Sequence, residues 1–404
     1  MLEMIELEQA QELILALAGS TSPEEVPLLQ SRGRVLAETV SAALDVPPFD
    51  RSPLDGYAVR GEDTLGILPA VLQLVGEIPA GSSFAGTIGP GMAVRILTGS
   101  PIPAGANAVI RQEDTQEEKG RVQIFQPVRP GANISRRGED LRLGEELFAP
   151  GRVLTPAEIG IMASQGLSRV QVFGRPRVAL ASTGDELKDV GTPLAPGQIY
   201  NSNFYTLAAM IDAWGGQTLP LGLVKDQVSD LAEVIRQGLA ASDLVVTTGG
   251  ASVGTYDVTA RAMERAGVEV AFWRAAFKPG TPVICGYKGD KLVLGLSGNP
   301  AAAMISAALL LGPAVRKLAG FKSFYPKRVQ ATSADEFGKS SGTRRFIRAK
   351  VAWEESGWTA SFPASQQPGI LRSMLGTNAL VDLMPWGTLQ AGQVCNAFLL
   401  EEWI

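Results

Sequence analysis

The spacing of apolar positions changes several times along this chain of 404 residues, and each change predicts a different kind of structure. Apolar residues at helical intervals predict helices over 4–18, 23–40 and 155–166. The second would begin with Ser22 as its N-cap and Pro23 at its first position, an arrangement typical of helix starts. We therefore expect helical segments on both sides of the region that they enclose.

That enclosed region, residues 45–148, carries short apolar runs separated by glycine and proline. Turn residues recur about every ten positions, which is typical of a small all-β module. The runs that predict its strands are VLQLVGEIPA, MAVRILTG, AVIRQED and RVQIFQPV.

From residue 176, strands and helices alternate for about 145 residues, which predicts a doubly wound parallel sheet with helices on both faces. Strands are expected at 177–183, 217–224, 243–250, 268–273 and 291–296, and helices at 201–216, 228–240, 257–267 and after Asn299. Beyond about residue 323 the helical spacing stops, and RRFIRAKVAW, NALVDLMP and QVCNAFLL predict the strands of a final β-module. The expected fold class is thus multidomain α/β plus β.

Composition narrows the chemistry, because the chain contains no histidine. Histidine-based triads, HExxH zinc sites and histidine general bases are therefore excluded. Carboxylates, lysine, arginine, hydroxyls and backbone amides remain, and these groups suit phosphates and oxyanions with a hard cation such as Mg²⁺.

Charge and cysteine usage point to a cytoplasmic protein. The net charge of −5 argues against a nucleic-acid partner. Cys285 and Cys395 each lie in an apolar run and are expected to be buried, reduced thiols. The acidic N-terminus does not resemble a signal peptide, and no uninterrupted apolar run is long enough to predict a membrane span.

Glycine-containing loops follow three of the predicted strands. They are STGDEL (182–187), TTGGASVGTYD (247–257) and SGNP (297–300). Ligands of open parallel sheets bind beyond the carboxyl ends of the strands, and backbone N–H groups in such loops can hold an anion. Each loop alone is equally typical of a tight strand–helix connection; three together favour a ligand site. The residues expected to form it are Thr183, Gly184, Gly249, Gly250, Ser252, Gly254, Ser297, Gly298, Asn299 and Pro300.

Charged residues accompany these loops. Glu186, Asp226 and Asp257 could each cap a helix, but several carboxylates at one sheet edge repel one another unless a cation compensates, which favours Mg²⁺. Arg274 and Lys278 precede a Pro-Gly turn and suit a phosphate or an oxyanion, although either alone is also typical of surface charge.

The motifs together resemble one family. PxxDRSPLDGYAVR, TGSPIPAGANAVIRQEDT, ISRRGEDL, STGDEL, TTGGASVGTYD, KPGTP and GLSGNP occur in the order found in the molybdopterin molybdenumtransferase family, which includes the C-terminal domain of gephyrin. The resemblance covers residues from about 5 to 402. It implies an elongated dimerising region (1–44 and 145–175), an inserted β domain (45–144), a molybdopterin-binding α/β domain (176–322) and a C-terminal β-barrel-like domain (323–404).

The resemblance also implies a reaction, in which adenylylated molybdopterin is cleaved to AMP and molybdate is inserted at the dithiolene sulfurs with the help of Mg²⁺. The family's functional residues match Asp55, Thr98, Asp140, Glu186, Asp226, Asp257 and Lys278, with Asp55, Glu186 and Asp257 as metal ligands. A homodimer that shares its sites between subunits is implied, and the molybdopterin adenylyltransferase is an expected pathway partner.

The chain departs from the family pattern at two positions. Arg274 stands where many members have a lysine, and Ser297 stands where the motif usually has proline. A C-terminal family arginine matches Arg344, Arg345 or Arg348, and the sequence leaves the three open.

Two other functions remain as alternatives. The adenylyltransferase of the same pathway resembles only 176–320, so the additional domains argue against it. A receptor-clustering scaffold like gephyrin would carry a long linker and a fused second domain, which this chain lacks.

Overall fold

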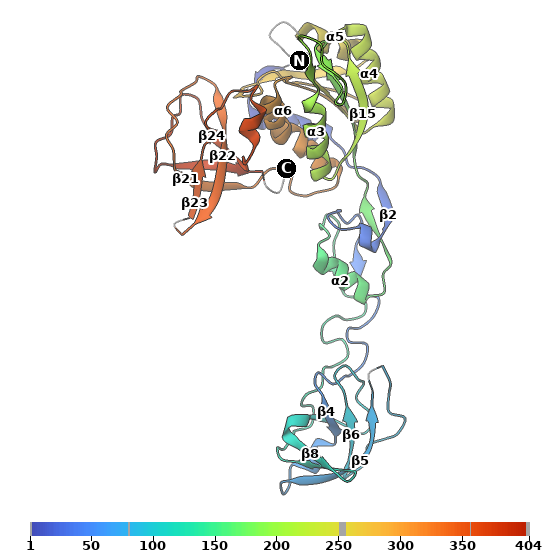
Figure 1. The fold of residues 1–404 in the computed structure, drawn as a ribbon. Helices are drawn as coiled ribbons and strands as arrows, with labels where there is room; N and C mark the ends of the chain where they lie inside the picture. Colours follow the sequence, from blue (N-terminus) through green and yellow to red (C-terminus); the bar gives the residue numbers. More distant parts are fainter. Residues whose placement is uncertain (1, 80, 250–255, 356, 401–404) are drawn as a thin grey trace. The chain divides into compact units, whose positions relative to one another are not determined.

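The computed structural model describes residues 2–79, 81–249, 256–355 and 357–400, and for Tyr256 and Asp257 it describes the backbone alone. The chain forms two compact units, which are described separately (Figure 1). Unit 1 contains Met1–Ala37, Pro150–Thr155 and Arg169–Ile404, and unit 2 contains Glu38–Ala149 and Pro156–Ser168.

A seven-stranded sheet forms the centre of unit 1, with the strand order β1-β17-β19-β20-β16-β12-β15. β19 runs antiparallel to both of its neighbours, and the other neighbouring pairs are parallel. β19 departs from the expected parallel sheet because only Gly289 and Asp290 separate it from β20, too few residues for a crossover. The strands are β1 (Leu2–Ile5), β12 (Arg177–Thr183), β15 (Gln217–Val224), β16 (Leu244–Thr248), β17 (Glu269–Ala275), β19 (Ile284–Lys288) and β20 (Lys291–Leu296).

Helices cover both faces of this sheet, which confirms the doubly wound arrangement. Val178 and Leu180 of β12 pack in one core, whereas Ala179 and Ala181 pack in another, as the alternation of side chains along a strand requires. The first core includes residues of α1 (Leu7–Leu17), α3 (Ser202–Ala213) and the helix after Asn299. The second includes residues of α4 (Val228–Ala241) and α5 (Tyr256–Arg265).

The helix after Asn299 is the most deeply buried of these elements. It comprises α6 (Pro300–Ser306), a π-helical turn η4 (Ala307–Leu311) and α7 (Gly312–Leu318), with Asn299 as N-cap and Pro300 in the first turn as expected. Pro300–Leu318 is long and apolar enough to cross a membrane, but 89% of its most apolar window is buried within the protein. That burial is typical of a core helix.

The C-terminal strands form a second sheet, ordered β18-β22-β23-β21-β25-β24, and an additional β22–β24 pairing closes it into a barrel. This arrangement confirms the expected β-barrel-like domain. The strands are β18 (Phe277–Lys278), β21 (Arg328–Ser333), β22 (Arg344–Glu354), β23 (Gly357–Ser361), β24 (Ala379–Leu383) and β25 (Val394–Leu399).

Aromatic side chains join the barrel to the α/β core. Phe346 of β22 lies edge-to-face against both Phe277 and Phe398, each at 5.7 Å between ring centroids. All three rings belong to the core that contains α1 and α3. Both cysteines are free and buried as expected, and burial raises the pKa of Cys285 to about 12.

The helix expected over 23–40 is absent, and that prediction is wrong. Pro23–Pro27 is strand β2, which pairs antiparallel with β11 (Arg169–Phe173). Pro27 would have stood inside the predicted helix, where proline lacks the N–H donor and clashes with the preceding turn. The first predicted helix is also shorter than expected, because Leu2–Ile5 joins the large sheet and α1 starts at Leu7. The third is confirmed as α2 (Pro156–Ser164).

Unit 2 contains the expected all-β module. Its six-stranded sheet has the order β7-β4-β6-β5-β9-β8, and a short pair joins β3 (Val40–Ser41) to β10 (Glu146–Phe148). A Cβ atom on Gly56 would lie 1.8 Å from the carbonyl oxygen of Ile110, so the β4–β7 pairing requires glycine there. The strands of the sheet are β4 (Gly56–Val59), β5 (Ala70–Ile78), β6 (Met92–Ile96), β7 (Ala108–Arg111), β8 (Thr115–Glu118) and β9 (Arg121–Ile124).

Phe346 offers a direct test of the junction between the barrel and the α/β core. Phe346→Ala should lower the free energy of unfolding by about 3–5 kcal/mol, because the ring is fully buried between two others. The shift of the urea midpoint, followed by circular dichroism, measures the effect. Leu375→Ala is the control, since Leu375 is 78% exposed and its loss should cost less than about 0.5 kcal/mol. Equal midpoints for the two variants would contradict this account of the junction.

Candidate functional site

A cavity of about 1210 Å³ lies at the carboxyl ends of the strands of the large sheet in unit 1. The ends of β12 and β16 contribute Thr183 and Thr248, and the turn after β20 contributes Ser297. The barrel domain contributes a further wall, formed by Phe337, Lys339, Arg345 and residues 364–369. The sheet edge selected from the sequence therefore borders the cavity, together with a barrel wall of which the sequence suggested only Arg345.

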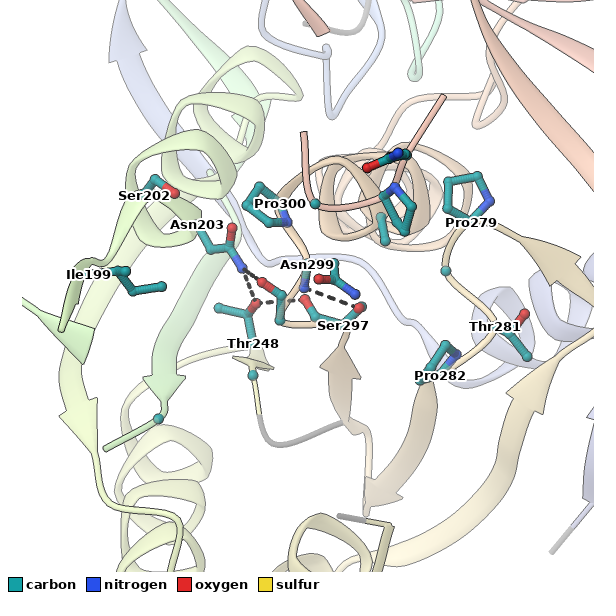
Figure 2. Close-up of a pocket in the computed structure, with 18 of the residues that line it drawn as sticks. Ile199, Ser202, Asn203, Thr248, Pro279, Thr281, Pro282, Ser297, Asn299 and Pro300 are labelled. Carbon is teal, nitrogen blue, oxygen red and sulfur yellow. Dashed lines mark hydrogen bonds between the residues drawn. The ribbon is translucent and has the colours of Figure 1, made fainter. Parts of the chain in front are cut away.

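Hydrogen bonds order the floor of this cavity (Figure 2). Asn203 of α3 donates to the hydroxyl of Thr248 at 3.0 Å and to the carbonyl of Gly298 at 2.8 Å. The Thr248 hydroxyl donates in turn to the carbonyl of Ser297 at 3.0 Å. The Ser297 hydroxyl accepts the N–H of Asn299 at 3.3 Å, so the serine that replaces the family's proline still stabilises the turn.

Glycine is required at the neighbouring position 249. Gly249 has φ +96°, and a Cβ atom there would lie 2.1 Å from the carbonyl oxygen of Thr183. The loop can approach β12 this closely only without a side chain. Gly250, Ser252 and Gly254, also expected to bind a ligand, lie outside the described residues.

Several polar atoms of the lining are buried but have no hydrogen-bond partner within the described chain. They are the hydroxyls of Ser182 and Thr183, Oδ1 of Asn203 and Oδ1 of Asp226. Buried polar atoms in folded proteins are almost always paired. Four such atoms around one cavity indicate groups prepared to bind a polar ligand.

The carboxylates of the lining fit a hard cation. Glu186 and Asp226 both line the cavity. Gln227 occupies the N-cap position of the helix after Asp226, so Asp226 is not its N-cap. Oδ1 of Asp226 is buried without a donor, an environment that suits a cation ligand. Mg²⁺ is commonly held by one or two carboxylates with substrate phosphates and water. Within the described segments, no group of three or more acidic or cysteine residues is placed to hold a metal ion without other ligands. The side chain of Asp257 lies outside the described part of the chain and is not covered by this statement.

The two cations expected beside the Pro-Gly turn are placed differently. Lys278 lines the cavity, whereas Arg274 is not among the lining residues. The guanidinium of Arg274 lies 3.9 Å from the ring centroid of Trp273, and its backbone has φ +65°. The expected pairing of Arg274 with Lys278 at the ligand is therefore not supported by the lining.

The three candidate arginines of β22 have distinct environments. Arg344 forms ion pairs with Glu8 and Asp382. Arg348 is fully buried, donates to the carbonyls of Ser365 and Gln367, and has a pKa that burial lowers to about 10. Arg345 alone among them lines the cavity. The register of β18 against β22 places it opposite Lys278.

The remaining predicted residues belong to unit 2. Asp55 accepts hydrogen bonds from the backbone N–H and the hydroxyl of Thr98, both at 2.7 Å. These two bonds, the backbone one first, lower the pKa of the Asp55 carboxyl. Asp140 is exposed, and its backbone N–H donates to the carbonyl of Val46. Asp55 and Thr98 thus form one polar group within the inserted β-module.

Sequence reasoning missed Lys339 and the 364–369 segment, which also line the cavity. Both follow the last helix of the α/β region, which ends at Leu318, and long-range contacts such as the pairing of β18 with β22 bring their domain to this edge. The one local signal was the Gly-Lys-Ser-Ser-Gly turn at 338–342.

Family models match three successive regions of the chain. Residues 5–166 match the MoeA N-terminal region (domain I and II), 179–317 match a probable molybdopterin binding domain, and 330–400 match the MoeA C-terminal region (domain IV).

Individual relatives agree with these matches. Molybdopterin molybdenumtransferase of Staphylococcus epidermidis is 34% identical over 93% of this chain and 91% of its own. Molybdopterin molybdenumtransferase 2 of Mycobacterium tuberculosis is 35% identical over 94% of this chain and 95% of its own. The crystal structure of the molybdopterin biosynthesis MoeA protein from Pyrococcus horikoshii superposes with a TM-score of 0.86 at 32% identity, covering 99% of this chain and all of that one. The chain therefore belongs to the molybdopterin molybdenumtransferase family, and it is a transferase of molybdenum cofactor biosynthesis.

Proposed function

We propose that this enzyme inserts molybdate into adenylylated molybdopterin, with release of AMP, and that it does so in the cytoplasm. The observation that carries the proposal is the cavity in unit 1. It combines two carboxylates, three cationic side chains and three further side chains with an unpartnered polar atom, those of Ser182, Thr183 and Asn203. Such a cavity suits a ligand with phosphate groups, a polar heterocycle and a second, inorganic oxyanion.

The proposed reaction consists of two balanced steps. A water oxygen adds to the adenylyl phosphorus, and the bridging P–O bond breaks. The phosphate of molybdopterin is the leaving group and stays on molybdopterin, while the attacking water loses a proton and becomes an oxygen of the released AMP. The two dithiolene thiols then give up their protons and bond to molybdenum. One oxygen of molybdate departs with both protons as water.

The residues of the cavity supply orientation and charge for these steps. Lys278 and Arg345 would stabilise the negative charge that develops on the phosphate and molybdate oxygens. Thr183, Asn203 and Ser297 offer hydroxyl and amide groups to the pterin and its phosphate. Glu186 and Asp226 would hold Mg²⁺, which polarises a phosphoanhydride when it is bound.

We further propose that the enzyme is a homodimer whose sites are shared between subunits. Asp55 and Thr98 of unit 2 would complete the cavity of the partner chain, and two-fold dimers are the commonest oligomers of soluble proteins. The molybdopterin adenylyltransferase, whose product would be the substrate here, is the proposed pathway partner.

The reaction itself is the first test. Purified protein with adenylylated molybdopterin, Mg²⁺ and micromolar molybdate should release AMP and form molybdenum-loaded cofactor, both followed by mass spectrometry. Glu186→Gln should lose most of this activity and keep the wild-type melting temperature, because its side chain is exposed. No AMP from a verified substrate would reject the proposed reaction. Unchanged activity of Glu186→Gln would reject the metal site.

The shared site predicts subunit complementation. Homodimers of Asp55→Ala and of Asp257→Ala should each be nearly inactive. A verified heterodimer of the two should recover part of the activity, since one of its two sites would contain no substitution. A heterodimer as inactive as its parents would mean that both residues act within one chain.

The contacts of Arg344 and Arg345 predict opposite phenotypes. Arg344→Ala should cost about 3–5 kcal/mol of unfolding free energy, because the Asp382 side chain, 10% exposed, would keep an uncompensated charge. Arg345→Ala should leave unfolding within about 1 kcal/mol of wild type and weaken binding of AMP. Urea denaturation and calorimetric titration separate the two effects, and destabilisation by Arg345→Ala equal to that by Arg344→Ala would make Arg345 a structural residue.

A further inference from the structure

The barrel wall of the cavity carries a lysine that neither the sequence motifs nor the proposed roles above explain. Lys339 lies in the turn between β21 and β22 and lines the cavity together with Lys278 and Arg345. We propose that Lys339 is a substrate-binding residue that contacts a tetrahedral oxyanion, either free molybdate or the phosphate of the adenylyl group. This inference rests on the proposed function and names a residue for its anion subsite.

Strand register brings the three cations to the same wall. Lys278 of β18 and Arg345 of β22 are partners in a parallel pairing. Partners in such a ladder direct their side chains to the same face of the sheet. Nη1 of Arg345 donates to the carbonyl of Lys339 at 2.9 Å, which ties the turn to this pair. Three cationic residues, from β18, from β22 and from the turn just before β22, therefore line the same cavity.

The turn is held on its other side as well. Phe337 and Leu389 exchange backbone hydrogen bonds of 2.8 and 3.0 Å. The ring of Phe337 packs edge-to-face on that of Phe362, with 6.2 Å between the ring centroids. The guanidinium of Arg345 lies 5.1 Å from the ring centroid of Phe337. The backbone that carries Lys339 is thus held in place at Phe337, two residues earlier, and again at the carbonyl of Lys339 itself. A lysine on an anchored turn needs little further ordering to bind a ligand.

The cations on this wall have no carboxylate partner within the described segments. No ion pair joins Lys278, Lys339 or Arg345 to a carboxylate of the described segments, although the whole chain carries a net charge of −5. Burial lowers the pKa of Arg345, as expected for a cation that gives up water without gaining a carboxylate. Like charges placed together repel, and a bound anion relieves that repulsion.

Lys339 also accounts for the cation that Arg274 does not provide. The guanidinium of Arg274 lies against Trp273, so the expected second cation beside Lys278 does not come from β17. The barrel domain supplies it instead. Lysine suits this role because a flexible ammonium group can follow a tetrahedral anion without a fixed fork geometry.

Calorimetric titration of the purified enzyme with sodium molybdate, AMP and adenosine tests the proposal. Lys339→Met should weaken binding of molybdate, of AMP or of both by about fivefold to tenfold, the effect expected for one charge-assisted bond still in contact with water. Loss with molybdate alone would assign Lys339 to the molybdate, and loss with AMP alone would assign it to the adenylyl phosphate. Adenosine, which has no phosphate, should bind both proteins equally.

Two further variants make the result specific. Lys350→Met removes an exposed lysine of the same domain that does not line the cavity, and it should bind both anions as wild type does. Lys339→Arg keeps the charge and should retain most of the affinity. In wild type, raising the salt concentration should weaken binding more steeply than in Lys339→Met.

The outcomes separate this inference from the proposed function. Wild-type affinity of Lys339→Met for both anions, while Lys278→Met binds them weakly, would overturn the role of Lys339 and leave the function intact. Failure of the wild-type enzyme to bind either anion would overturn the proposed function, and this inference with it.

Discussion

The cavity depends on one junction, the docking of the C-terminal barrel on the α/β core through β18, β22 and the rings of Phe277, Phe346 and Phe398. β18 is two residues long, yet it sets the register that places Lys278 beside Arg345. The buried rings stabilise this short pairing, which in isolation would be marginal. The same hydrophobic contacts that stabilise the fold therefore also position the charged wall of the cavity.

The wall of the cavity that the α/β core forms contains polar atoms that are buried without a hydrogen-bond partner. Ser182, Thr183 and Asp226 each have a buried oxygen without a partner in the described protein. Each such atom lowers stability, because it has lost water without gaining a hydrogen bond. The apolar strands beneath, such as β16 with all five residues buried, offset that cost. The site is thus built from groups that a ligand can satisfy better than the empty protein does.

Local patterns in the sequence predicted most of the unit 1 core and four of the six strands of the unit 2 sheet, β5, β6, β7 and β9. Helical spacing, Asn299 with Pro300, and the alternation of strands and helices act over short distances, and the structure confirms them. The failures concern long-range pairing. Residues 23–27 become a strand because β11, more than 140 positions later, pairs with them. Lys339 lines the cavity because β22, which follows it, pairs with β18. No local spacing encodes these contacts.

The absence of histidine fits this design of site. Histidine is the side chain whose ordinary pKa brings a change of charge near neutral pH. The cavity is lined instead by lysine, arginine and carboxylate side chains. The turn at Ser297, where proline is usual, is also held without a titrating group. The serine hydroxyl accepts the N–H of Asn299, and the serine carbonyl accepts the hydroxyl of Thr248. Under the proposed function, phosphate and molybdate would be held by charge and hydrogen bonds, and neither of these requires a histidine.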